Sequence, residues 1–162
     1  RSESIYEKKT FRESFKRRRC IIPINGFYEW KKDEKDKTPF FVSDIKNEYF
    51  ALAGIWDEYF DIELDMKIVT IALITCDANE KQSKIHHRMP VVLEKKDFSK
   101  WLRSEDIKEL NSLLKIYPNE KIDIYEVSKE VNKVLFDDAI CIKKSIYNKK
   151  KKKEETGQLL FF

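Results

Sequence analysis

The feature that most constrains the fold is a series of short runs rich in β-branched and aromatic residues. Such runs are typical of β-strands, and turn residues or charged clusters separate them. The run at residues 66–76 has no polar alternation, so we expect a central strand that is buried on both faces. The predicted strands lie in CIIPINGFYEW, TPFFVSDI, EYFALAGIWDEYF, MKIVTIALITC, MPVVLEK, IDIYEVS and AICIKK.

Helical periodicity is confined to three short segments. TFRESFKRRR predicts an amphipathic helix in which Thr10 and Glu13 form a capping box. DFSKWLRS and SEDIKELNSLLKI predict two further helices that are capped by Asp97 and Ser104. Because strands outnumber helices without a recurring βα rhythm, we predict an α+β fold. We expect curved mixed or antiparallel β-sheets in an open barrel-like core, with a few flanking helices.

The length of 162 residues suits one domain, which we expect over residues 1–147, followed by a basic flexible tail over residues 148–162. No run of about 18 apolar residues is present, so we expect no transmembrane helix and no membrane partner. The three cysteines are widely spaced and include no CxxC pair. This spacing favours reduced thiols in the cytoplasm and argues against a disulfide framework, a zinc site or another metal cofactor.

The net charge of +4 is spread unevenly along the chain. Residues 1–19 carry eight Lys or Arg and three Glu, which gives 8 − 3 = +5, and residues 143–162 carry seven Lys and two Glu, which gives 7 − 2 = +5. The middle of the chain therefore carries 4 − 10 = −6. Two basic ends around an acidic body favour a polyanionic partner, and the alternative is a solubilising surface.

Two short segments contain side chains suited to proton transfer. Glu29 in GFYEW shares a strand face with Phe27 by alternation, and a partly desolvated carboxylate there would suit acid–base work. His86 in IHHRMP is a candidate general acid or base, because histidine titrates near neutral pH, and Arg88 beside it is suited to holding a phosphate. The alternatives are an edge-strand glutamate that faces water and histidines in a surface loop.

The basic segment FRESFKRRRC mixes aromatic and cationic residues, as single-strand nucleic-acid binders do. We expect its phenylalanines to pack inward and Arg18 and Arg19 to contact DNA. The alternative is a solvated helix face whose phenylalanines belong to the core.

Together these segments resemble the SOS response-associated peptidase (SRAP) family over about residues 1–142. The pairing of RCIIPINGFYEW with IHHRMP is more specific than either segment alone. The resemblance is carried, in this order, by RSES, FRESFKRRRCIIPINGFYEW, TPFF, ALAGIWDEY, TCDAN, IHHRMPVVL and EVSKEVN.

The resemblance implies a DNA-repair protein that binds abasic sites in single-stranded DNA. Family members crosslink to the site through an N-terminal cysteine, which autoproteolytic removal of the initiator Met exposes and which forms a Schiff base and then a thiazolidine. By the same resemblance, Glu29 positions the cysteine amine and carries its proton, and His86 assists opening of the sugar and Schiff-base formation. Arg1 and Arg88 are expected at DNA phosphates, and His87 falls on a variable position.

The sequence departs from the family pattern because Cys20, Cys76 and Cys141 are all internal. We therefore expect that residues 1–162 alone do not form the crosslink, and that the protein acts on DNA in the cytoplasm, at the nucleoid of a bacterium. A non-catalytic module that binds single-stranded or damaged DNA is the alternative. A peptidase, as the family name suggests, is a third possibility.

The segment GQLLFF resembles the pentapeptide Gln-Leu-x-Leu-Phe by which bacterial repair proteins dock on the replicative sliding clamp. The resemblance implies a clamp as a partner of the tail. The alternative is a frayed tail or a last strand that packs on the domain. The expected anchors are Gln158, Leu159, Phe161 and Phe162.

Overall fold

The computed structural model describes residues 1–33 and 36–145. The strands are β1 (Arg19–Ile24), β2 (Gly26–Lys32), β3 (Lys37–Asp44), β4 (Phe50–Asp61), β5 (Met66–Leu73), β6 (Thr75–Asp77), β7 (Arg88–Pro90) and β8 (Ile122–Glu126). The α-helices are α1 (Lys9–Arg17), α2 (Glu80–Ser83), α3 (Phe98–Arg103) and α4 (Ile107–Ser112). Short 3-10 helices occupy Lys95–Asp97, Asn119–Lys121, Lys129–Asn132 and Ala139–Ile142. In this described part, no helix is long and apolar enough to cross a membrane.

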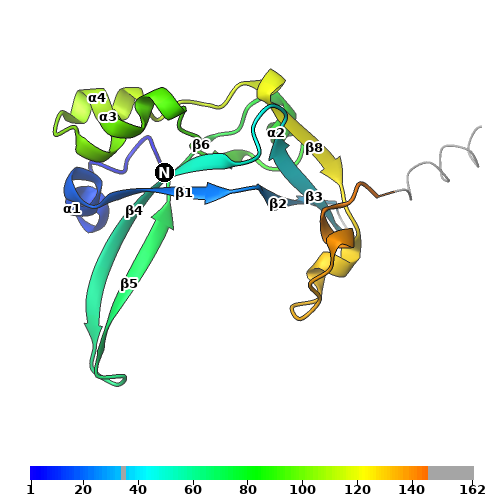
Figure 1. Ribbon diagram of the computed structural model, residues 1–162, viewed down its shortest axis with the longest axis horizontal. Helices are drawn as coiled ribbons and strands as arrows, with labels where there is room; N and C mark the ends of the chain where they lie inside the picture. The colour runs from blue at the N-terminus through cyan, green and yellow to red at the C-terminus, as the bar shows by residue number, and fades with distance from the viewer. Residues whose placement is uncertain (34–35, 146–162) are drawn as a thin grey trace, which may run out of the picture.

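The strands form three small sheets with the orders β1-β4-β5, β2-β3-β8 and β6-β7. All five strand pairings are antiparallel. Helices α1, α3 and α4 gather at one end of the molecule, and α2 lies near β2, β3 and β8 at the other (Figure 1). This arrangement confirms an α+β fold with antiparallel sheets and few helices. No sheet closes into a barrel over the described ranges.

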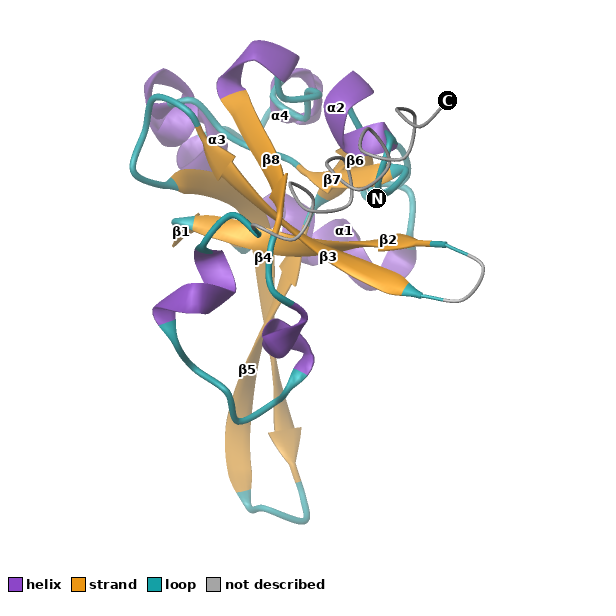
Figure 2. Ribbon diagram, turned by 90° about the vertical axis from the view of Figure 1, so that its right-hand side faces the viewer, coloured by secondary structure: helices purple, strands orange, loops and turns teal. Residues whose placement is uncertain are grey.

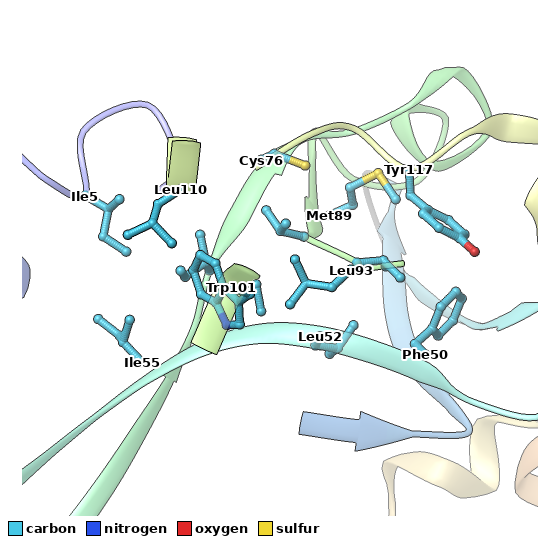
Figure 3. Packing of buried hydrophobic residues seen from close by; sticks show 14 of the residues in the cluster. Ile5, Phe50, Leu52, Ile55, Cys76, Met89, Leu93, Trp101, Leu110 and Tyr117 are labelled. Atoms are coloured by element: carbon cyan, nitrogen blue, oxygen red, sulfur yellow. The ribbon is translucent and has the colours of Figure 1, made fainter. Parts of the chain in front are cut away.

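One hydrophobic core joins β4 to the helices and to the segment that contains β6 and β7 (Figure 3). Trp101 of α3 is fully buried in it, with its ring 6.0 Å from the ring of Phe15. The indole Nε1 donates a hydrogen bond of 2.9 Å to the carbonyl oxygen of Cys20, so its one polar atom is satisfied inside the core. The packing therefore ties α1, β1 and α3 into one unit.

The first half of β4 is the central strand of this core. Residues 50–55 are all buried, and β1 pairs with them along one edge from Arg19↔Ile55 to Ile24↔Phe50. The other edge is hydrogen-bonded to chain segments that have no long strand of their own: Ala53 N donates to Val91 O at 2.9 Å, and Ile74 N donates to Ala53 O at 3.0 Å. The uninterrupted apolar sequence FALAGI thus fits a strand buried on both faces.

The prediction of a doubly buried strand at residues 66–76 is wrong. β5 pairs with β4 from Gly54↔Leu73, at the end of the buried half, to Asp61↔Met66, and seven of its eight residues are exposed. The two strands form a hairpin that projects from the rest of the molecule (Figures 1 and 2). Besides β4, no element of the described ranges is paired with β5, and most of its apolar side chains stay exposed. Only Ile74 and Cys76, at the end of the run, enter the core.

Three other local expectations are corrected. The segment AICIKK forms a 3-10 helix, because the Asp138 side chain accepts from Ile140 N at 2.8 Å and caps a turn there. Helix α1 begins at Lys9, with Lys8 as its N-cap, so Thr10 lies inside the helix. Helix α4 is capped by Asp106, whose side chain accepts from Lys108 N. In these places local hydrogen bonds and backbone angles decide the type of element or the residue at which a helix begins, and sequence periodicity does not define either with single-residue precision.

Candidate active site

Strand β2 presents Glu29 on the face of its sheet that turns toward the core. The Phe27 ring lies 5.9 Å from the ring of Phe50 on this face, whereas the Tyr28 ring packs 5.3 Å from Phe41 on the opposite face. The expected alternation is therefore confirmed. The strands approach closely at Gly26, where an added Cβ would lie 2.6 Å from the carbonyl oxygen of Val42, so the tight start of β2 needs a glycine. Glu29 follows three residues later and keeps 23% of its side chain exposed.

His86 follows the short helix α2 and is held by its last turn. The Asn79 side chain caps α2 by accepting from Gln82 N at 2.9 Å, and His86 N donates to Gln82 O at 2.9 Å. The ring is fixed by its Nδ1 atom, which lies 3.2 Å from the backbone nitrogen of Arg88. The polar segment DANEKQSKI therefore acts as a short, capped support for the histidine.

Glu29 and His86 meet across the two elements. Oε2 of Glu29 lies 3.8 Å from Nδ1 of His86, and the side chains are 23% and 38% exposed. This separation is too long for a direct hydrogen bond, and catalytic contacts are often this loose before a substrate binds. The pair therefore places a partly exposed carboxylate and imidazole within reach of one small polar group.

His87 does not point away from His86, as an extended segment would require. A bend at residue 87 brings the two rings to a centroid distance of 4.5 Å, with His87 itself exposed. Within the described ranges no group of three or more His, Cys, Asp or Glu side chains is arranged to hold a metal ion. The second histidine contacts the first and takes no part in the Glu29 contact.

Arg88 binds two carboxylates and a carbonyl beside the histidines. Its Nη atoms donate to both oxygens of Glu3, at 2.8 and 3.0 Å, to Asp77 Oδ1 at 2.6 Å and to Thr75 O at 2.7 Å. The guanidinium holds the pKa of Glu3 well below its ordinary value, at about 2. Only 11% of the Arg88 side chain is exposed. In this conformation Arg88 anchors the N-terminal segment to β6 and β7, and its expected contact with a DNA phosphate stays a prediction.

The other three arginines expected at DNA lie in different environments. Arg1 is exposed in the segment beside β6, where Ser2 N donates to Thr75 O at 2.8 Å. Arg18 lies at the base of the hairpin, where its Nη2 is 3.0 Å from Asp57 Oδ1.

Arg19 is buried, with 9% exposed. Its guanidinium donates to the carbonyl oxygens of Phe15 and Trp101 at 2.6 Å, to that of Ser104 at 2.6 Å and to that of Lys16. These carbonyls belong to the C-terminal ends of α1 and α3, where a cation is favourable. An arginine in this position joins two helix ends. We therefore do not include Arg19 among the residues proposed to contact DNA.

One polar residue at the site carries no recognisable sequence signal. Gln82 is fully buried, and neither of its amide atoms has a hydrogen-bond partner among the described residues. Arg88 Nε is likewise buried without a partner in that part of the chain. Buried polar atoms are nearly always satisfied, so unpaired atoms so close in sequence to His86 are unusual. A glutamine in a polar helix looks unremarkable until its burial is known.

The sequence model of the family "SOS response associated peptidase (SRAP)" matches residues 1–134. The chain therefore belongs to this family. It is 36% identical over 135 residues to the abasic site processing protein YobE of Bacillus subtilis strain 168. That match covers 82% of this chain and 61% of the relative. It is also 30% identical over 162 residues to the abasic site processing protein HMCES of Gallus gallus, which covers 88% of this chain and 48% of the relative. The chain thus spans less than two thirds of the length of these relatives.

The fold is similar to solved structures. A crystal structure of a protein from Bacteroides thetaiotaomicron matches with a TM-score of 0.83 and 32% identity, over 90% of this chain and 64% of that one. A protein from Bordetella bronchiseptica matches with a TM-score of 0.70 at 24% identity, which supports the fold alone.

Proposed function

We propose that this chain supplies the DNA-binding surface and the proton-transfer residues of an SRAP-type repair protein that acts on abasic sites in single-stranded DNA. The approach of Glu29 Oε2 to His86 Nδ1, at 3.8 Å, carries the proposal. The relatives are abasic site processing proteins, which supports the substrate class. The protein would then work on DNA in the cytoplasm.

The proposed reaction uses the open-chain form of the abasic sugar, which exposes an aldehyde. An N-terminal cysteine amine adds to the aldehyde carbon, and Glu29 passes the proton that the amine releases to the aldehyde oxygen, which becomes a hydroxyl. His86 gives a proton to this hydroxyl, which leaves as water, and the proton that remains on the nitrogen passes back to His86 as the C=N bond forms. The cysteine thiol then adds to this bond, and its proton passes to the nitrogen as the thiazolidine closes. Such positioned acid–base groups accelerate a step by about 10²- to 10⁴-fold.

We place the nucleophile outside the cysteines of this sequence. Cys20 lies in β1 and Cys76 in β6, where burial raises the pKa of the Cys76 thiol to about 11. Cys141 is buried in a 3-10 helix. None of them has a free α-amine, so none provides amine and thiol from one residue. The proposed N-terminal cysteine would be exposed by autoproteolysis, and this self-cleavage is the only peptidase activity we assign.

A second candidate function is a non-catalytic module for single-stranded or damaged DNA, which the mixture of aromatic and cationic residues in FRESFKRRRC favours. Substitution of Glu29 and His86 separates the two. If they perform chemistry, their loss reduces crosslinking and leaves DNA affinity nearly unchanged. If the chain only binds DNA, any effect of their loss appears in affinity.

The first test is a denaturing gel of single-stranded DNA that carries one abasic site. The 162-residue chain is compared with a version extended upstream to begin with the cysteine of the full-length protein. We expect a crosslinked band only with the extended version. A band with the 162-residue chain would show that another amine performs the chemistry and would contradict the cysteine mechanism.

In the extended version, Glu29→Gln and His86→Ala should each slow crosslinking about 100-fold or more. DNA affinity should stay within about threefold of wild type, since neither change removes a cation that faces a phosphate. His87→Ala is the matched control, because it removes an adjacent imidazole that does not contact Glu29. Equal losses for all three variants would contradict the assignment.

The tail for which we expect clamp binding lies outside the described residues. We retain the proposal that residues 148–162 form a tail separate from the domain at residues 1–147, and that Gln158, Leu159, Phe161 and Phe162 dock on a sliding clamp. A basic linker that ends in apolar anchors suits this role. Gln158→Ala combined with Phe162→Ala should abolish binding in a titration with the clamp. Unchanged affinity would end the proposal.

A further inference from the structure

A cavity of about 300 Å³ lies beside the Glu29–His86 pair, between β2, β3, α2 and β8. Its volume reaches the lower end of the range for small-ligand sites. The chain links it to both members of the pair: Phe40 is the register partner of Glu29, and Lys84 and Ile85 directly precede His86. The lining residues are Lys31, Phe40, Lys81, Lys84, Ile85, Asp123 and Ile124.

Three lysines give this cavity its charge. Lys81 Nζ donates to the carbonyl oxygen of Ile122 at 2.9 Å, which holds the ammonium at the cavity without neutralising it. Lys31 has a loose ion pair with Asp33, at 3.8 Å. Among the ion pairs of the described residues, none involves Lys81 or Lys84. The cations are therefore available to an anion.

A second cavity, of about 430 Å³, shows the contrast. There Lys121 Nζ lies 2.6 Å from Glu94 Oε1, and the Tyr117 hydroxyl donates to Asp44 Oδ2 at 2.6 Å. Glu94, Lys121 and Asp44 of its lining are thus paired within the protein. The lysine cavity differs because Asp123 is its one acidic lining residue, and alternation along β8 places Asp123 on the opposite sheet face from Ile124.

Half-buried apolar side chains complete the lining. Phe40, Ile85 and Ile124 each keep part of their surface exposed, next to the lysines. An aromatic ring beside cations is the combination with which proteins hold a base and its phosphate together. A free inorganic anion would leave this apolar surface in water, whereas a nucleotide covers it.

The spacing relates the cavity to the proposed reaction. Glu29 and Lys31 are two residues apart on β2 and share a sheet face. Two residues of strand span about 7 Å. A DNA strand whose sugar lies at Glu29 therefore passes Lys31 within about one or two nucleotides.

We propose that this lysine cavity binds the nucleotide next to the abasic site, with its phosphate at Lys31 and Lys84 and its base against Phe40. The proposal rests on the proposed function for the identity of the strand. The cavity takes any base, because lysines and a ring face read phosphate and stacking surface rather than base edges. It holds the strand in place while Glu29 and His86 act on the neighbouring sugar.

The test measures fluorescence anisotropy with oligonucleotides that carry a stable tetrahydrofuran analogue of the abasic site. The analogue is placed internally, at the 5′ end or at the 3′ end, so that a flanking nucleotide is present on both sides or on one. Wild type is compared with Lys31→Ala, Lys84→Ala and the double variant. Lys108→Ala is the control, since Lys108 is exposed on α4, away from the cavity. Thermal melting confirms that all variants fold.

We expect wild type to gain affinity when a nucleotide is added on one particular side of the lesion. In each lysine variant, this increase in affinity should be roughly fivefold smaller than in wild type. The salt slope of binding should fall by about 0.7 for each lost phosphate contact. Lys108→Ala should retain the full gain. If the double variant retains both the gain and the salt slope of wild type, the proposal is overturned.

The same experiment separates this proposal from the proposed function. If wild type binds undamaged and abasic strands equally, the abasic-site function is contradicted. The cavity is then judged on the undamaged strand, where the double variant should still lose affinity and salt slope. If wild type prefers the lesion and the double variant binds like wild type, only the cavity proposal fails.

Discussion

The two halves of β4 are continuous in sequence and opposite in environment. Residues 50–55 are buried, with β1 on one edge and the segments around Ile74 and Val91 on the other. From residue 58 to residue 60 the strand is exposed, with only β5 beside it in the described ranges. Tyr59 and Phe60 are 52% and 57% exposed although they are as apolar as the residues of the inner half.

The difference shows that burial in this molecule follows from partners rather than from residue type. The inner half is covered because α3 and the segment that contains β7 fold back over it (Figure 3). The hairpin extends beyond these elements (Figure 2). Large exposed apolar patches mark interaction sites or surfaces prone to association, so the hairpin and the core should respond to substitution in opposite ways.

The largest expected effect is on the inner half of β4. Leu52 is 1% exposed, so Leu52→Ala should lower the free energy of unfolding by about 2–5 kcal/mol through lost burial and the cavity left behind. Ile71→Ala in the hairpin, where the side chain is 61% exposed, should change it by about 0.5 kcal/mol or less. Urea denaturation followed by circular dichroism measures both. Comparable losses would mean that the hairpin is covered in solution.

The two adjacent arginines test the same contrast with charged groups. Arg19→Met leaves four carbonyl oxygens without their donor in a buried position, and should cost about 3 kcal/mol. Arg18→Met removes the ion pair with Asp57 at the base of the hairpin, and should cost about 1 kcal/mol or less. The measurement is again urea denaturation. A larger loss for Arg18 than for Arg19 would contradict the assignment of Arg19 to the helix ends.

A smaller effect concerns pH and the Arg88–Glu3 contact. The folded pKa of Glu3, about 2, is below its ordinary value of 4.5. The contact therefore contributes stability that is present above pH 4.5 and is lost as pH falls toward 2. Because half of the Glu3 side chain is exposed, solvent screening keeps this contribution below about 1 kcal/mol.

Glu3→Gln should remove this contribution and flatten the dependence of unfolding free energy on pH between 5 and 3. Glu7→Gln is the control, since the Glu7 carboxylate has no ion pair with another described residue. A pH profile that is identical in wild type and Glu3→Gln would show that the contact does not persist in solution.

The smallest change in stability is expected in the hairpin, together with a change in association. Val69 and Ile71 are 59% and 61% exposed on an edge strand, a position that promotes pairing with another chain. Ile71→Lys should leave the unfolding free energy within about 0.5 kcal/mol and should reduce concentration-dependent association in sedimentation velocity. If wild type is monomeric at all concentrations tested, the apolar hairpin does not self-associate.

Local sequence pattern predicted much of the β-sheet architecture. The strands around Phe27, Phe41 and Leu52 were expected from their β-branched and aromatic content, and the alternation that places Glu29 beside Phe27 is confirmed by the ring contacts of β2. The pattern failed at β5, because a continuous apolar run has the same appearance whether or not other elements cover it. The lysine cavity was missed for a related reason, since Lys31 lies on β2 whereas Lys81 and Lys84 lie in and directly after α2, about 50 residues further along the chain.

The sequence by itself determined the family, the α+β class and the identity of the two candidate catalytic residues, because these depend on residue types and their order. Only the tertiary structure decided which residues lie in contact and which are buried. It brought Glu29 to His86 across 57 positions of sequence (86 − 29 = 57), buried Arg19 between two helix ends and left β5 exposed. Burial and charge pairing depend on what lies opposite each side chain, and that information is not local to any segment of the chain.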